Sequence, residues 1–307
     1  MKTLALLALV LLPACSVVER VGVHVLGRRA EIPVDRVVRE IFYTAANEKR
    51  QSLDLYLPAE KNPPVIVFIH GGGWNTGDKN LRAGGLDVYG NIGRFYASRG
   101  IATAVINYRL MPAVTWRDQL EDAAQAVAWV HGHAPRYGAD ASRLFVMGHS
   151  AGAWIASNVA LNQGLQEFAG LKPGDIDGLI CASGAALDLL DEKTFETEDI
   201  RYYVKRFGPR DQVTWAEASP ATHIDDTDPR ALVLVTTGEA KGLQRQALIF
   251  SDRLAGSGVK TGFVAVKGES HSRMVLVLSH PDKAAAPEIL RFVFGEQVPV
   301  SAKSSPR

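Results

Sequence analysis

The chain has 307 residues, of which 47% are hydrophobic, and this suits one large domain or two small ones with a substantial core. Its 34 basic residues stand against 33 acidic ones, which gives a formal net charge of +1, and Lys and Arg form no run that would follow a phosphate backbone. The composition therefore excludes a largely disordered chain and disfavours nucleic acid as a partner.

The N-terminus has the pattern of an export signal. Met1 and Lys2 precede an apolar run over residues 4–12, which is too short to span a bilayer but suits the central region of a signal peptide. The run leads into Cys15 in a Leu-Pro-Ala-Cys sequence that is similar to a bacterial lipobox, in which the cysteine becomes the lipid-modified first residue. We therefore expect residues 1–15 to be a signal peptide, Cys15 to be lipidated, and the protein to be anchored in the bacterial cell envelope. Ordinary cleavage with a periplasmic or secreted product, and an uncleaved anchor, are the alternatives.

Cysteine usage excludes a disulfide framework. The chain has two cysteines, and Cys181 lies in the apolar run 178–182, so we expect a buried structural thiol. The sequence has no C-x-x-C or H-E-x-x-H spacing, so it predicts no metal site.

The pattern beyond the leader predicts a single catalytic domain over residues 34–296, after a tether over 16–33 and before a flexible tail over 297–307. Residues 51–58 alternate apolar and polar side chains and predict a half-exposed strand. Residues 65–70 form an unbroken apolar run up to His70, as in a buried parallel strand, and lead directly into three glycines. Glycines at that point favour a backbone that approaches a ligand and directs N–H groups at it.

Strands and helices alternate through most of the domain. Further strands are expected over 101–108, 144–148, 178–183, 231–237 and 262–266, and helices over 86–98, from 115 to 130, and over 153–161, 243–254 and 284–294. This order predicts an α/β fold with a mostly parallel sheet flanked by helices on both faces, and ligands on such sheets bind at the carboxyl ends of the strands. Residues 187–228 break the rhythm and are expected to form a small cap over the pocket.

Ser150 is the candidate nucleophile. It stands in Gly-His-Ser-Ala-Gly between the strand that begins at Leu144 and a helix, which is the context of a nucleophile elbow. The helix N-terminus behind such a serine presents free N–H groups to an oxyanion.

A serine needs an imidazole to take its proton and a carboxylate to orient that imidazole, and in this arrangement the chain order is serine, acid, histidine. Three of the eight histidines follow Ser150. His271 falls in a polar loop, 267–272, directly beyond the last strand, so we predict that it is the general base. His223 is expected to be structural and His280 to lie at a helix end. Of the histidines that precede the serine, His70 and His149 are expected to brace loops, and His131 and His133 to lie on the surface.

Glu239 is the best candidate for the acid because it is the first carboxylate beyond the strand 231–237. Glu269 is the second choice, although its short separation from His271 disfavours a good hydrogen bond to the imidazole. Weaker candidates are Asp211, Asp225, Asp226 and Asp228.

These motifs together resemble an α/β-hydrolase of the esterase/lipase group with an HGGGW oxyanion loop. The resemblance rests on residues 70–74 with 77–79, on 107–110 and on 148–152, and it extends over about residues 35 to 295. Within the group the chain is most similar to carboxylesterases of the feruloyl-esterase-like and kynurenine-formamidase-like branch. In that branch the acid stands six places before an Arg-Gln pair, which maps to Glu239 before Arg245, with glutamate where many members have aspartate.

The resemblance implies a role for each matched position. Ser150 would attack the acyl carbon, His271 would move its proton, and Glu239 would hold the imidazole. The backbone N–H groups of Gly72, Gly73 and Ala151 would bind the oxyanion, and Trp74 would line the substrate pocket. Water would then hydrolyse the acyl-enzyme, so neither a metal nor an organic cofactor would be required.

The sequence therefore favours a serine esterase that acts on a small-molecule ester of a short acyl or aromatic acid. An arylformamidase that hydrolyses a formyl amide is the alternative enzyme, since the same triad would serve. The alternative of another class is an inactive hydrolase fold used as a binding module.

Overall fold

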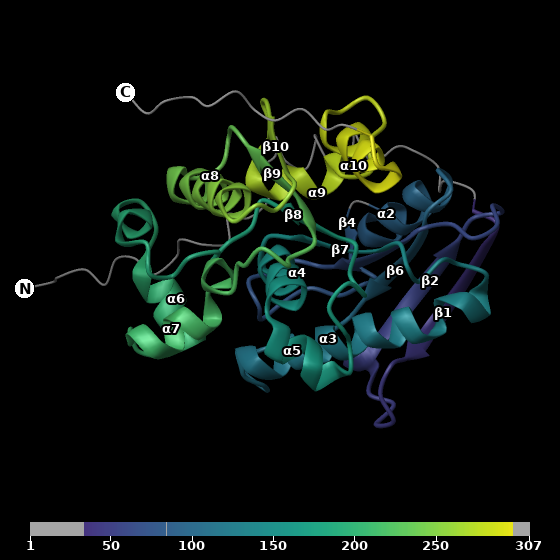
Figure 1. Cartoon of the computed structure of the whole chain (residues 1–307), viewed down its shortest axis with the longest axis horizontal. Coiled ribbons are helices and arrows are strands. Elements are labelled where there is room, and N and C mark those ends of the chain that lie inside the picture. Colours follow the sequence, from purple (N-terminus) through teal and green to yellow (C-terminus); the bar gives the residue numbers. More distant parts are fainter. Residues whose placement is uncertain (1–33, 84, 297–307) are drawn as a thin grey trace, which may run out of the picture.

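The computed structural model describes residues 34–83 and 85–296 and shows a central sheet flanked by helices (Figure 1). The eight-stranded sheet has the order β1-β2-β6-β3-β7-β8-β9-β10. Its strands are β1 (Arg36–Phe42), β2 (Ser52–Leu57), β3 (Val65–Ile69), β6 (Ala102–Ile106), β7 (Leu144–His149), β8 (Gly178–Ala182), β9 (Arg230–Thr236) and β10 (Thr261–Val266), and a separate two-stranded ribbon joins β4 (Arg82–Ala83) to β5 (Leu86–Asp87). The predicted signal peptide, tether and C-terminal tail lie outside the described residues.

The sheet is parallel from β6 to β10, and only β1 and β2 run antiparallel to their neighbours. Side chains along β3 alternate between two apolar clusters: Val65, Val67 and Ile69 belong to one, and Ile66 and Phe68 to the other. A strand that is apolar on both faces needs helices on both faces, which explains the unbroken apolar run in the sequence. The predicted α/β class is confirmed.

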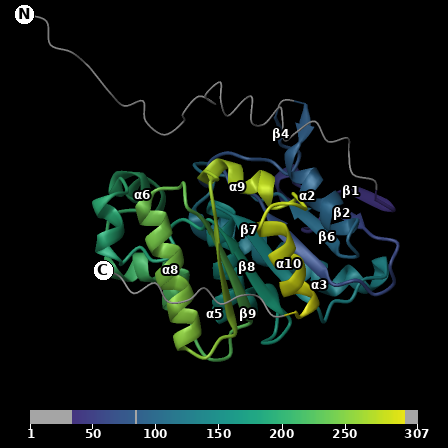
Figure 2. The same ribbon diagram turned by 90° about the horizontal axis from the view of Figure 1, so that it is seen from above.

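Helices cover both faces of the sheet. They are α2 (Val88–Ala97), α3 (Trp116–His133), α4 (Ala151–Leu161), α5 (Gln163–Ala169), α6 (Ile200–Phe207), α7 (Gln212–Ala218), α8 (Lys241–Gly256), α9 (His271–Val277) and α10 (Ala285–Phe294), with short 3₁₀ turns η1 (Lys49–Gln51), η2 (Ala134–Tyr137), η3 (Glu192–Glu196) and η4 (Pro220–Thr222). Apolar residues of α3, α4 and α8 join one cluster, and those of α2, α9 and α10 join the other. Helices α6, α7 and α8 lie at one end of the sheet, and β1 and β2 lie at the other (Figures 1 and 2).

Helix α3 begins where the sequence predicts. The Thr115 hydroxyl accepts a hydrogen bond from the Asp118 N–H, and the Asp118 carboxylate accepts one from the Thr115 N–H. This capping box satisfies two N–H groups that the helix itself leaves without acceptors.

Strand β2 was predicted to be half-exposed, and this prediction was wrong. All six of its residues are buried, including Ser52 and Asp54 at polar positions of the alternation. The strand lies between β6 and β1, a strand that the sequence analysis did not predict. The Asp54 carboxylate is stabilised away from water because it receives hydrogen bonds from Lys79 and Arg39.

The segment 187–228 leaves the sheet between β8 and β9, as expected, and folds into η3, α6, α7 and η4. It has apolar anchors of its own, since Phe207 and Trp215 are almost fully buried.

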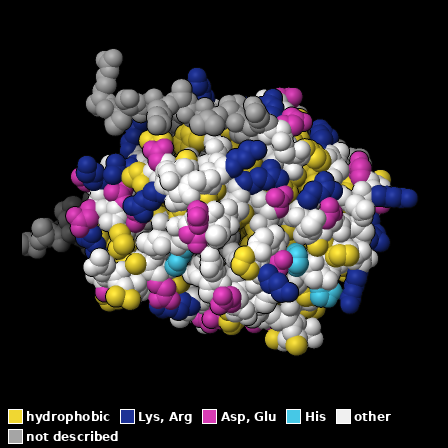
Figure 3. Space-filling model, viewed as in Figure 1, with side chains coloured by type: hydrophobic (Ala, Val, Ile, Leu, Met, Phe, Trp, Pro, Cys, Tyr) yellow, Lys and Arg dark blue, Asp and Glu magenta, His cyan; other side chains and the backbone are white. Residues whose placement is uncertain are grey.

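Cys181 is a free, buried thiol, as predicted, and burial raises its pKa to about 12. Among the described residues, no helix is long and apolar enough to cross a membrane. On the face drawn in Figure 3, acidic and basic side chains are interspersed, with no large patch of one sign.

Candidate active site

Ser150 stands at a sharp turn between β7 and α4. Its backbone has φ 58° and ψ −122°, a conformation that a residue with a side chain rarely adopts. The turn requires glycine on both sides: a Cβ at Gly148 would lie 2.0 Å from the Gly152 carbonyl oxygen, and one at Gly152 would lie 2.2 Å from the Ile69 carbonyl oxygen. The strained backbone directs the hydroxyl out of the sheet at the N-terminus of α4.

The structure brings the predicted serine, histidine and acid into one hydrogen-bonded chain. The Ser150 Oγ lies 2.8 Å from His271 Nε2, and His271 Nδ1 lies 2.7 Å from Glu239 Oε2. A carboxylate accepts hydrogen bonds, so Nδ1 carries the proton and Nε2 is left to accept the serine proton. These three residues come from the carboxyl ends of β7, β9 and β10.

Glu239 is held in one orientation by its second oxygen. Oε1 accepts hydrogen bonds from the Thr236 N–H at 2.9 Å and from the Ser183 hydroxyl at 3.2 Å. The Glu239 side chain has 0% exposure, whereas that of His271 has 29%. The acid is therefore dry and fixed, and the imidazole stays accessible to a substrate.

His271 differs from its prediction in one respect. It is the first residue of α9 and not part of a loop. A short helix after the last strand carried no clear periodicity in the sequence, because only Met274 and Val277 of its seven residues are buried.

Glu269, the alternative acid, points to other partners. Its carboxylate forms ion pairs with Arg273 at 3.0 Å and with Lys283 at 3.0 Å. Of the weaker candidates, Asp211 caps α7 and Asp228 accepts a hydrogen bond from the Asp225 N–H. The geometry therefore favours Glu239 over all of them.

The glycine loop after β3 lies beside the serine. A Cβ at Gly71 would be 3.2 Å from the Ser150 Cβ, and Gly72 has φ 128°, with a hypothetical Cβ only 2.1 Å from the Thr76 carbonyl oxygen. In the described part of the chain, the N–H groups of Gly72 and Gly73 have no acceptor. Ala151 begins α4, where the first N–H groups have no acceptor within the helix.

Trp74 does not line an open pocket, and that expectation was wrong. Its side chain has 0% exposure and packs edge-on against Trp154 and Phe207. The Trp74 carbonyl accepts hydrogen bonds from Gln119 Nε2 at 2.7 Å and from the Met111 N–H at 3.0 Å. The indole is thus an internal support for the loop, because aromatic packing offers more stabilisation there than contact with solvent.

His70 and His149 brace loops, as predicted. His70 Nδ1 donates to the Gly71 carbonyl at 2.7 Å, and His149 Nε2 donates to the His271 carbonyl at 3.0 Å. Burial lowers the pKa of His70 to about 4, and burial together with the neighbouring His271 lowers the pKa of His149 to about 3. Both rings are therefore neutral near pH 7.

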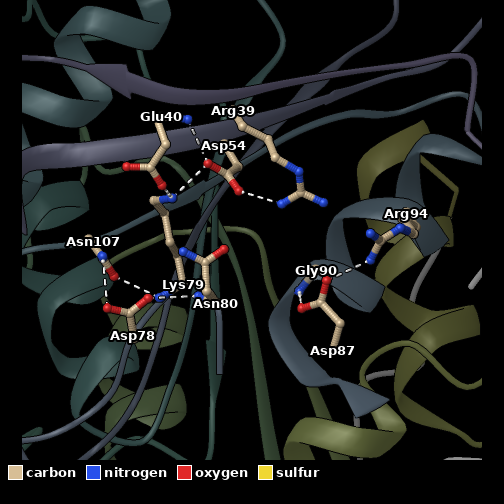
Figure 4. A network of polar contacts seen from close by, with 10 residues as sticks. All are labelled: Arg39, Glu40, Asp54, Asp78, Lys79, Asn80, Asp87, Gly90, Arg94 and Asn107. Atoms are coloured by element: carbon tan, nitrogen blue, oxygen red, sulfur yellow. Dashed lines mark hydrogen bonds and ion pairs between the residues drawn. The ribbon is translucent and has the colours of Figure 1, made fainter. Parts of the chain in front are cut away.

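A buried charge network anchors the loop that follows Trp74, as Figure 4 shows. The Lys79 ammonium, 1% exposed, contacts Glu40 and lies 2.7 Å from Asp54. The Lys79 N–H donates to Asn107 Oδ1 at 2.7 Å, so the loop is tied to β1, β2 and the end of β6. Lys79 and Asn107 belong to the motifs that carry the resemblance, but no role could be predicted for them from the sequence.

Two side chains of α6 contact the glycine loop at Gly73, and the sequence did not predict these contacts. Arg206 Nε donates to the Gly73 carbonyl at 2.9 Å, and the Tyr202 hydroxyl lies 2.5 Å from the position of a hypothetical Gly73 Cβ. Contacts between segments so distant in sequence leave no local signal.

Comparison with known proteins places this arrangement in a family. The profile of the BD-FAE family matches residues 53–249, a span that contains the glycine loop, the elbow and Glu239. The chain belongs to the BD-FAE family. The match covers more than half of the chain.

Curated relatives of this BD-FAE chain carry esterase names. It is 39% identical over 134 residues to a "Probable isoprenylcysteine alpha-carbonyl methylesterase" of Oryza sativa subsp. japonica, covering 43% of this chain and 29% of that protein. It is 30% identical over 216 residues to the "Probable carboxylic ester hydrolase LipM" of Mycobacterium tuberculosis, covering 67% of this chain and 47% of that protein. The chain thus spans less than half the length of these relatives.

Solved structures share the BD-FAE chain's fold. Esterase B from Lactobacillus rhamnosis superposes with a TM-score of 0.71 at 22% sequence identity, covering 92% of this chain and 91% of that one. At this level of identity, the likeness supports the α/β-hydrolase fold alone.

Proposed function

We propose that this protein is a serine hydrolase that cleaves carboxylic esters of short acyl or aromatic acids. The observation that carries the proposal is the chain of hydrogen bonds from Ser150 through His271 to Glu239, with Gly72 and Gly73 beside it. Family membership and the esterase names of the relatives support the same reaction class.

The geometry supports a two-step reaction. His271 Nε2 takes the proton of Ser150 as the oxygen bonds to the acyl carbon, and it then donates that proton to the departing alcohol. Water attacks the acyl-enzyme in the second step and gives its proton to the same nitrogen. His271 then returns this proton to the Ser150 oxygen as its bond to the acyl carbon breaks and the acid leaves. The Glu239 carboxylate stabilises the imidazolium formed in each step.

The N–H groups of Gly72, Gly73 and Ala151 would bind the negative oxygen of the tetrahedral intermediates. Each such donor typically contributes about 2.7–4 kcal/mol to the transition state. The chemistry derived from these residues involves no metal or organic cofactor.

Substitution of the serine tests the proposal. Ser150→Ala is expected to lower kcat/KM for 4-nitrophenyl acetate by at least about a thousandfold, because the covalent step is lost. A phosphonate ester should label the wild type at Ser150 alone, as mapped by mass spectrometry. Undiminished turnover in Ser150→Ala would contradict the mechanism.

A substrate panel identifies the reaction more closely. Acetyl, longer-chain and aromatic esters should be hydrolysed, with N-formylkynurenine slower than the best ester. Preferential hydrolysis of N-formylkynurenine would instead make the protein an arylformamidase. If no member of the panel is hydrolysed and the phosphonate does not label Ser150, a binding module with this fold would be favoured.

We also propose that the protein is exported and anchored in the bacterial cell envelope by lipid on Cys15. The support is the charged start, the short apolar run and the lipobox-like sequence before that cysteine. Loss of membrane association in Cys15→Ala is the direct test.

A further inference from the structure

One face of α6 covers the oxyanion loop. Tyr202 and Arg206 stand four residues apart, so their side chains leave the same face of the helix. A Cβ at Gly73 would lie 2.5 Å from the Tyr202 hydroxyl and 3.7 Å from Arg206 Nη2. Two hydrogen-bond donors from the segment 187–228 therefore meet at the loop beside the serine.

Arg206 is half-buried without a negative partner. Its Nε and Nη1 donate to the carbonyls of Gly73 and Tyr202, each at 2.9 Å, and it forms no ion pair within the described residues. Other partly buried arginines do have such a partner: Arg109 pairs with Asp122, and Arg230 with Asp177. A guanidinium removed from water without a counter-charge costs free energy, and this cost is recovered when an anion binds.

Two aromatic rings fix the orientation of the Arg206 guanidinium. Its carbon lies 3.4 Å from the centre of the Tyr202 ring and 5.8 Å from that of Trp74, so stacking fixes its plane. The Tyr202 hydroxyl has no hydrogen-bond partner in the described part of the chain. Arg206 Nη2 and this hydroxyl are thus two groups beside Gly73 that can still donate a hydrogen bond to a ligand.

We propose that Arg206 Nη2 and the Tyr202 hydroxyl bind a carboxylate group carried by the ester substrate. A planar carboxylate with two acceptor oxygens matches a guanidinium edge next to a hydroxyl. This inference rests on the proposed esterase function and specifies the substrate class for the same site.

The position of Glu198 indicates how the proposed ligand is oriented in the site. This residue lies just before α6, and its Oε1 is enclosed without a hydrogen-bond partner in the described part of the chain. Its carboxylate interacts electrostatically with His271, Glu239 and Tyr202, whereas no such interaction connects it to Arg206. An anion would be repelled at that end, so the substrate carboxylate belongs at the Arg206 end, beside Gly73.

Arg206 could instead serve only to fasten the loop through the Gly73 carbonyl. Such a role would affect every ester equally. Charged and neutral substrates of the same shape therefore separate a binding residue from a positioning one.

Two matched pairs provide this comparison. Monomethyl succinate and methyl 4-methylpentanoate differ by a carboxylate or an isopropyl group on the acyl side. Acetoxyacetate and isobutyl acetate differ in the same way on the alcohol side. Acid release in a pH-stat gives kcat/KM for all four, and the pair that discriminates shows which side of the ester carries the carboxylate.

The wild type is expected to prefer the charged member of one pair by about tenfold or more, as for a charge-assisted hydrogen bond. Arg206→Met should remove this preference, Arg206→Lys should retain part of it, and Tyr202→Phe should reduce it. Equal losses for both members in Arg206→Met, or no preference in the wild type, would overturn the inference.

A binding measurement makes the inference independent of turnover. In the Ser150→Ala background, calorimetry should show monomethyl succinate or acetoxyacetate bound about tenfold or more tightly than in Ser150→Ala/Arg206→Met. Equal dissociation constants would overturn the inference. Arginine-dependent binding without any ester turnover would overturn the proposed esterase function and leave the carboxylate site standing.

Discussion

At the scale of single residues, the orientation of one imidazole determines the reactivity of the serine. His271 Nδ1 faces Glu239, so Nε2 faces Ser150 as an acceptor. Glu239 is the one triad position at which the resemblance implied a different residue, aspartate. The buried donors Thr236 N–H and Ser183 Oγ hold the longer side chain in the position that the triad requires.

Glu239→Gln should lower kcat for an ester by about a hundredfold to ten thousandfold. The amide nitrogen would donate to His271 Nδ1 and shift the ring proton to Nε2, which then cannot accept the serine proton. Glu269→Gln is the matched control, since that carboxylate pairs with Arg273 and Lys283 instead. Assays with 4-nitrophenyl acetate measure both, and a larger loss in the control would make Glu269 the acid.

His149 makes stability depend on pH. Its pKa is about 3 in the folded protein and near 6.5 when exposed, so the unfolded chain binds the extra proton as pH falls below 6.5. Its contribution to stability is thus lost as pH falls. Between pH 7.5 and pH 5 we expect this one residue to cost about 2 kcal/mol.

Urea unfolding of the wild type and of His149→Gln at both pH values measures this effect. The difference between the two proteins matters, because Asp228, whose pKa burial raises to about 7, acts in the opposite direction. The variant should lose about 2 kcal/mol less than the wild type over this range. Identical pH dependence in His149→Gln would contradict the assignment.

At the scale of elements, the glycine loop after β3 is held by groups from several strands and a helix. Lys79 binds it to Asp54 of β2, Asn107 binds it to the end of β6, and Arg206 of α6 binds Gly73 from the other side. A loop with three consecutive glycines has a large conformational entropy to lose. These anchors restrict the loop before substrate binds.

Lys79→Met is expected to lower the free energy of unfolding by about 3–5 kcal/mol, because it leaves Asp54 in the core without its nearest cation. Arg117→Met removes an ion pair with Glu217 in which both partners are about half exposed, and should cost about 1 kcal/mol or less. Urea denaturation of both variants tests the comparison. A cost for Lys79→Met as small as that of the control would show that the buried network is not an anchor.

At the scale of the whole molecule, the proposed export and anchoring would depend on the N-terminal residues. In a bacterial host, wild-type protein should appear in the membrane fraction, and Cys15→Ala should appear in a soluble fraction or retain its leader. Cys181→Ala is the control, since that thiol is buried and free. Equal membrane association of wild type and Cys15→Ala would exclude the lipid anchor.

The sequence by itself determined the strands of the main sheet except β1, together with helices α2, α3, α4, α8 and α10, and it placed Ser150, Glu239 and His271 beyond strand ends in that chain order. It could do so because buried parallel strands leave continuous apolar runs, and because functional side chains follow the ends of such strands. The sequence also shows where the backbone requires glycine, as on both sides of the turn at Ser150.

Only the tertiary structure decided which polar residues are buried and which groups meet across the chain. Asp54 has the pattern of an exposed position, yet Lys79 and Arg39 bring it into the core. The buried Trp74 side chain supports the glycine loop, and Arg206 contacts that loop from a helix distant in sequence. Such contacts arise from packing between segments far apart in sequence, and periodicity reports only the burial of neighbouring residues.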